Sequence, residues 1–94
     1  MTTKLIFKKF KAGDVIAIFP ELPGTNNPYL TCLTYMNVGQ HSSASIEFCG
    51  KLKAAKPNEY LPLYSELIRL GYDDLEIVKK FSRKMLQSRI NQTL

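Results

Sequence analysis

The residues of this sequence that could do chemistry lie in a stretch without lysine or arginine. Between Ala12 and Gly50 the chain holds its single histidine, His41, and both of its cysteines, Cys32 and Cys49. A cysteine and a histidine can act as nucleophile and base, and all three together could hold a soft metal ion. The spacing favours neither, because there is no short Cys-x-x-Cys pair, glycine-flanked cysteine elbow or orienting acid. We therefore predict two free, mostly buried thiols and no catalytic residue, metal or cofactor. An enzyme acting through His41 is the third function considered.

The segment around His41 offers polar groups that suit a ligand or a protein partner. Gly39 allows close approach to the backbone, and the amide and hydroxyl groups after it donate and accept hydrogen bonds. The alternative is a turn or bulge whose side chains bond to their own backbone. A surface of this kind would serve a homodimer, or an accessory or inhibitor protein of a phage or mobile element, which is the second function considered. Its predicted residues are Tyr35, Asn37, Gln40, His41 and Ser42.

The basic residues give the stronger electrostatic signal. The 13 lysines and arginines all lie outside residues 12–50 and face only 8 acids, so the net charge is +5 at pH 7. If the first and last strands are neighbours, the two basic ends converge on nucleic acid or an acidic partner, and Phe7, Phe10 and Phe81 could stack on single-stranded bases. A solvated face whose phenylalanines are core is the alternative. This non-catalytic binding module is the first function considered, and its predicted residues are Lys8, Lys9, Lys11, Lys79, Lys80, Arg83 and Lys84.

Alternating apolar residues indicate the strands that must position these groups. We expect strands over residues 4–10, 15–19, 29–38, 44–50 and 75–81, with a loop at 39–43. Lysines on both faces of the first strand favour an edge position. Pro20 is expected to end the second strand, because proline cannot donate to the ladder.

Helical spacing predicts a helix over residues 57–70, followed by Gly71 as a C-cap, and a short last helix capped by Ser82. The order of elements predicts an α+β fold of two layers, with an antiparallel sheet of four to five strands and one or two helices packed on one face. The whole chain, 1–94, is expected to be one domain.

Three segments together resemble a group of small proteins encoded by gut-type bacteria and their phages or mobile elements. These segments are GDVIAIFPE at 13–21, VGQH at 38–41, and PNEY at 57–60 with residues 67–72. The resemblance covers most of residues 4–81. The chain departs from the pattern at Ser42, where a glycine often follows the histidine, and at Lys56, where a threonine often precedes the helix. The group has no assigned activity, so no functional residue is carried over.

Composition and apolar run lengths bear on location. The chain is 45% hydrophobic and 22% charged with a mean hydropathy of −0.15, which is typical of globular proteins. Its apolar runs are far shorter than the roughly 20 residues that span a bilayer, and no secretory signal is evident. We expect a cytoplasmic protein of a bacterial host cell with no membrane contact.

Overall fold

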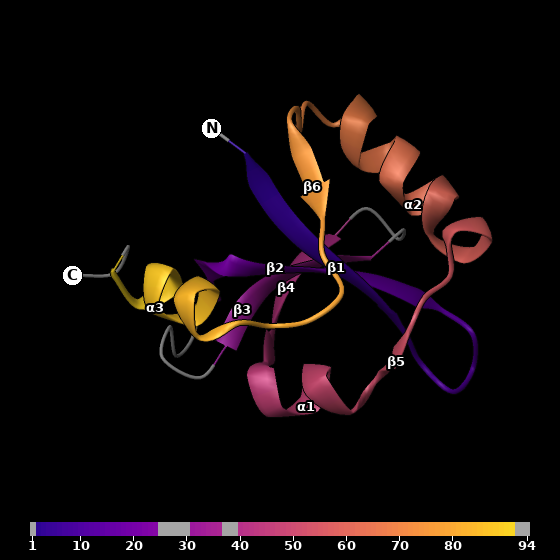
Figure 1. Cartoon of the computed structure of the whole chain (residues 1–94). Helices are drawn as coiled ribbons and strands as arrows, with labels where there is room; N and C mark the ends of the chain where they lie inside the picture. The colour runs from indigo at the N-terminus through magenta and orange to yellow at the C-terminus, as the bar shows by residue number, and fades with distance from the viewer. Residues whose placement is uncertain (1, 25–30, 37–39, 92–94) are drawn as a thin grey trace.

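The computed structural model describes residues 2–24, 31–36 and 40–91, which form a curled, largely antiparallel sheet with three helices (Figure 1). The strands are β1 (Thr3–Lys9), β2 (Val15–Pro23), β3 (Thr31–Met36), β4 (Gln40–Ser45), β5 (Lys53–Ala54) and β6 (Leu75–Ile77). The helices are α1 (Ile46–Lys51), α2 (Pro57–Arg69) and α3 (Arg83–Asn91). The predicted α+β class is confirmed. None of the helices in these described ranges is long and apolar enough to cross a membrane.

The first strand lies inside the sheet, so the prediction that it forms an edge is wrong. The strand order is β4-β3-β2-β1-β5, and β6 also pairs with β1. β5 runs antiparallel to the end of β1, whereas β6 runs parallel to its start. Two very short strands therefore share one side of β1, and neither has enough residues to show a clear alternation in the sequence.

The second strand passes through Pro20, which was expected to end it. β2 continues to Pro23, and its register against β3 shifts between Phe19 and Pro23. Proline is tolerated at such an irregularity because the ladder of hydrogen bonds is already interrupted there.

The predicted loop at 39–43 and strand at 44–50 are replaced by β4 and α1. Ser45 ends the strand and caps the helix, since its hydroxyl oxygen accepts a hydrogen bond from the Phe48 N–H at 3.1 Å. Glu47 in the first turn adds a favourable charge at the helix N-terminus. A local cap therefore outweighs the apolar alternation at Ala44, Ile46 and Phe48.

The two later helices form where they were predicted. The Glu59 carboxylate accepts a hydrogen bond from the Lys56 N–H at 2.8 Å at the start of α2, and Gly71 takes a φ of +108° after its end. Ser82 caps α3 by accepting from the Met85 N–H at 3.2 Å. β6 ends at Ile77, short of the predicted residue 81, because only three of its residues pair with β1.

Alternate residues of the central strands build two clusters on opposite faces of the sheet. The aromatic cluster, which α2 covers, contains Leu5, Phe7, Ala17, Phe19, Tyr35, Leu63 and Leu67. The thiol cluster contains Ile6, Ile16, Ile18, Cys32 and Cys49. α1 contributes Cys49 to the thiol cluster, and Arg89 of α3 hydrogen-bonds Cys32 there. α1 and α3 thus lie on the face of the thiol cluster, and α2 covers the face of the aromatic cluster.

Candidate functional site

A cleft of about 320 Å³ opens beside the turn between β1 and β2, and four lysines line it. We call it the lysine cleft; its residues are Lys9, Phe10, Lys11, Lys51, Leu52 and Lys53. They come from the end of β1, the turn that follows, the last residue of α1 and the start of β5 (Figure 1). Residues far apart in the sequence therefore make one basic surface.

The strand register brings the lysines together. Lys9 of β1 is the direct antiparallel partner of Lys53 of β5. Like charges placed opposite each other in a sheet destabilise it. Lys11 lies two residues after Lys9 and Lys51 lies two residues before Lys53, so the same cleft collects two more positive charges.

Nearby acids neutralise only part of this charge. The Lys9 Nζ lies 2.7 Å from the Glu59 Oε2, and this hydrogen bond, with that from the Lys56 N–H, lowers the pKa of Glu59. Glu47 lies 3.6 Å from the Lys51 Nζ, but both side chains are well exposed and such pairs contribute little. Within the described part of the chain, no carboxylate forms an ion pair with Lys11 or Lys53. The cleft keeps a positive surplus.

One phenylalanine, Phe10, lines the cleft, and a second ring, that of Phe48, packs against it. The centroids of Phe10 and Phe48 are 5.9 Å apart, and Phe48 is 45% exposed. The sequence pattern predicts that Phe7, Phe10 and Phe81 could stack on bases. Phe7 is only 3% exposed in the aromatic cluster, and Phe81 packs against the thiol cluster.

The structure separates the predicted basic residues. Lys9 and Lys11 line the lysine cleft, and Lys8 pairs with Ala54 beside it. β6 runs parallel to β1 and ends at Ile77, which pairs with Leu5. Lys79, two residues later, therefore lies near the middle of β1 and lines a separate cleft with Phe7.

The remaining predicted residues, Lys80, Arg83 and Lys84, are exposed. Arg83 and Lys84 begin α3, which lies across the molecule from the β1–β2 turn (Figure 1). The expected convergence of the two chain ends therefore does not reach α3.

Sequence reasoning missed Lys51, Lys53 and Phe48 as site residues. The basic connection over residues 51–56 is visible in the sequence. Its pairing with β1 is not, because β5 has only two residues.

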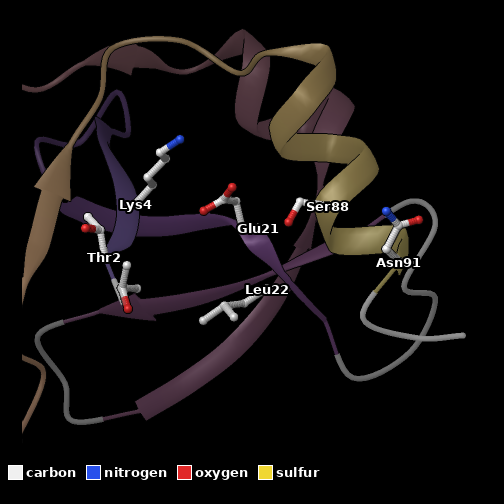
Figure 2. A pocket seen from close by; sticks show the side chains of 7 residues that line it. Thr2, Lys4, Glu21, Leu22, Ser88 and Asn91 are labelled. Atoms are coloured by element: carbon white, nitrogen blue, oxygen red, sulfur yellow. The ribbon is translucent and has the colours of Figure 1, made fainter.

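A larger cleft of about 450 Å³ lies at the other end of β1, beside α3. We call it the polar cleft; its residues are Thr2, Thr3, Lys4, Glu21, Leu22, Ser88 and Asn91. Figure 2 shows the Glu21 side chain between those of Lys4 and Ser88. Among the described residues that line this cleft, one amine and one carboxylate balance in charge, and none is a cysteine or histidine. It offers hydrogen bonds but no nucleophile paired with a base.

One residue of the neutral surface predicted around His41 lies in the core. Tyr35 is 1% exposed in the aromatic cluster, and burial together with a hydrogen bond to Glu66 raises its pKa. Asn37 lies outside the described residues. The backbone of Gln40, His41 and Ser42 forms part of β4, paired with residues 34–36 of β3.

Both cysteines are buried and unbridged, as predicted. His41 pairs with Tyr35 in the register, whereas Cys32 pairs with Ala44 and packs in the other cluster. Among the described residues, no group of three or more His, Cys, Asp or Glu side chains could hold a metal ion.

Compared with known proteins, the chain matches no family model, no curated protein and no solved structure. Its function is therefore inferred from its own surfaces.

Proposed function

We propose that this protein is a small non-catalytic module that binds single-stranded nucleic acid in the lysine cleft. The observation that carries the proposal is the pairing of Lys9 with Lys53, with Lys11 and Lys51 beside them. Their mutual repulsion falls when phosphate oxygens enter the cleft, and neutralised phosphates release counterions.

The exposed ring of Phe48 favours single strands over duplexes. A base can stack on a phenylalanine only when its face is free, and stacking tolerates any base. The ring of Phe48 packs against that of Phe10, which itself lines the cleft, so an exposed aromatic ring lies next to the lysine cleft.

The test is a titration of a labelled oligo(dT) of about 15 nucleotides, followed by fluorescence anisotropy at several salt concentrations. Four phosphate contacts on a single strand predict a slope of log K against log salt of about −3. Lys51→Glu/Lys53→Glu should weaken binding by at least about tenfold.

The matched control is Lys80→Glu/Lys84→Glu, which changes the net charge equally but lies outside the cleft. It should change affinity by less than about threefold, because salt screens distant charges. Equal losses in both variants would contradict a localised site, and absence of binding at low salt would exclude the function.

A specific observation favours one further function, a contact with a second protein through β4. Among the described residues β4 pairs only with β3, and its sequence, Gln40–Ser45, contains no lysine or proline of the kind that protects sheet edges. Strand addition at this edge would give a homodimer or a complex with another chain. Light scattering that shows a monomer over a wide concentration range would exclude the homodimer.

A further inference from the structure

The two cysteines meet where α1 packs on the sheet. Cys32 of β3 pairs with Ala44 of β4, and α1 begins directly after Ser45, so Cys49 returns above β3 after one helical turn. Both side chains are 0% exposed, belong to the same cluster and hydrogen-bond each other. The chain topology therefore brings together the only two thiols in the sequence.

Two cations lie beside this pair. Arg89 of α3 is 1% exposed and donates a hydrogen bond to the side chain of Cys32. Lys8 places positive charge near Cys49.

The hydrogen bond between the thiols divides their roles. It lowers the pKa of Cys49, and the charge of Lys8 acts in the same direction. It raises the pKa of Cys32, and burial adds to this effect. The pair therefore favours one thiolate, on Cys49, that accepts a hydrogen bond from one thiol, on Cys32.

We propose that Cys32 and Cys49 form a redox-active dithiol that hydrogen peroxide oxidises to an intramolecular disulfide. The Cys49 sulfur attacks one peroxide oxygen and the O–O bond breaks, which gives a sulfenic acid on Cys49 and one water. The Cys32 sulfur then attacks the Cys49 sulfur, the S–O bond breaks, and a second water leaves with the Cys32 proton. Two thiols and one hydrogen peroxide thus give one disulfide and two waters.

The short helix provides the access that the closed cluster lacks. α1 has six residues, and helices this short are marginal without packing, so local opening of α1 exposes Cys49 before the rest of the sheet. Hydrogen peroxide is little larger than water and needs only a small opening. A bulky disulfide such as oxidised glutathione should react more slowly.

The experiment treats the reduced, folded protein with hydrogen peroxide, then unfolds it in iodoacetamide for intact mass measurement. We expect the loss of two hydrogens, no alkylation, a monomer on a non-reducing gel and full reversal by dithiothreitol. Two alkylated thiols, or only intermolecular disulfides, sulfinic acids or sulfonic acids, would overturn the proposal.

Single variants separate the two roles. Cys32→Ala should stop at a sulfenic acid on Cys49 that dimedone traps, whereas Cys49→Ala should leave Cys32 almost unreactive. Lys8→Gln, in a partly exposed side chain, should slow alkylation of Cys49 at neutral pH and leave the circular dichroism spectrum unchanged. Equal reactivity of both cysteines would contradict the assigned roles, and the wild-type mass measurement decides the disulfide even if a variant fails to fold.

Oxidation should also alter the lysine cleft, a consequence that depends on the proposed function. Cys49 lies between Phe48 and Lys51 on α1, so a disulfide to β3 would shift both residues. Oligonucleotide affinity should change on oxidation of the wild type and stay constant in Cys32→Ala/Cys49→Ala. The mass measurement tests the disulfide separately, so failure of one proposal would not be mistaken for failure of the other.

Discussion

The two clefts at the ends of β1 differ more in charge than in size. The polar cleft, at the start of the strand, is the larger, at about 450 Å³ against about 320 Å³ for the lysine cleft. Among the described residues, one amine faces one carboxylate there, whereas the four amines of the lysine cleft have only two carboxylate partners, Glu59 and Glu47. The uncompensated positive charge, and not the volume, therefore makes the lysine cleft the better candidate site for an anionic ligand.

The cross-strand partners of β1 explain this contrast. At its start the register partner of Lys4 is Glu76 of β6, which carries the opposite charge. At its end Lys9 pairs with Lys53 of β5, and like charges repel. A protein gains nothing in stability from the second arrangement, which is why we assign it to binding.

Reversing the charge of one lysine at each end of β1 should have the largest effects on stability and on oligonucleotide affinity. Lys53→Glu places a carboxylate opposite Lys9, so it should raise the melting temperature and weaken oligonucleotide binding by about tenfold. Lys4→Glu places a carboxylate opposite Glu76, so it should lower the melting temperature and change the affinity by less than about twofold. Calorimetry and fluorescence anisotropy on the same samples measure both quantities. Loss of affinity in Lys4→Glu alone would reverse the assignment of the clefts.

Removing the exposed ring should have an intermediate effect. Phe48→Leu keeps an apolar contact with Phe10 but loses about 1 kcal/mol of stacking on a base, or roughly fivefold in affinity. Leu70→Ala is the control, because Leu70, at the end of α2, is 53% exposed and does not line either cleft. If both variants bind as the wild type does, the lysines act alone and an acidic protein becomes the better partner.

The ion pair at Lys9 should give the smallest effect. Glu59→Gln removes the carboxylate that pairs with Lys9, so oligonucleotide affinity should rise by up to about twofold. At neutral pH the free energy of unfolding of Glu59→Gln should be lower than that of the wild type. The pKa of Glu59 is lowered in the folded protein, so its carboxylate stabilises the fold at pH values above its ordinary pKa of 4.5. As pH falls through the folded pKa, this contribution disappears and the two unfolding curves should converge. A constant difference at every pH would show that the substitution acts through packing.

The sequence predicts those elements whose causes are local. The helix that ends at Gly71 and the cap at Ser82 depend on residues within one turn, and both are confirmed. The cap at Ser45 is equally local, but the apolar alternation from Ala44 to Phe48 concealed it.

The sequence pattern does not show which distant segments pair in the sheet. The pairing of Lys9 with Lys53 depends on a two-residue strand 44 positions away, and the lysine cleft follows from that pairing. The sequence therefore identifies the basic character of the site and half of its lysines. It misplaces the partner segment, which comes from residues 51–53 and not from α3.

The most direct test of the lysine cleft is a two-dimensional NMR titration of the labelled protein with an unlabelled oligo(dT). We predict that the backbone amide signals of residues 9–11 and 48–53 shift on binding, while those of residues 2–4, 21–22 and 88–91 stay in place. Shifts confined to the polar cleft, or centred on residues 80–84, would contradict the assignment of nucleic-acid binding to the lysine cleft.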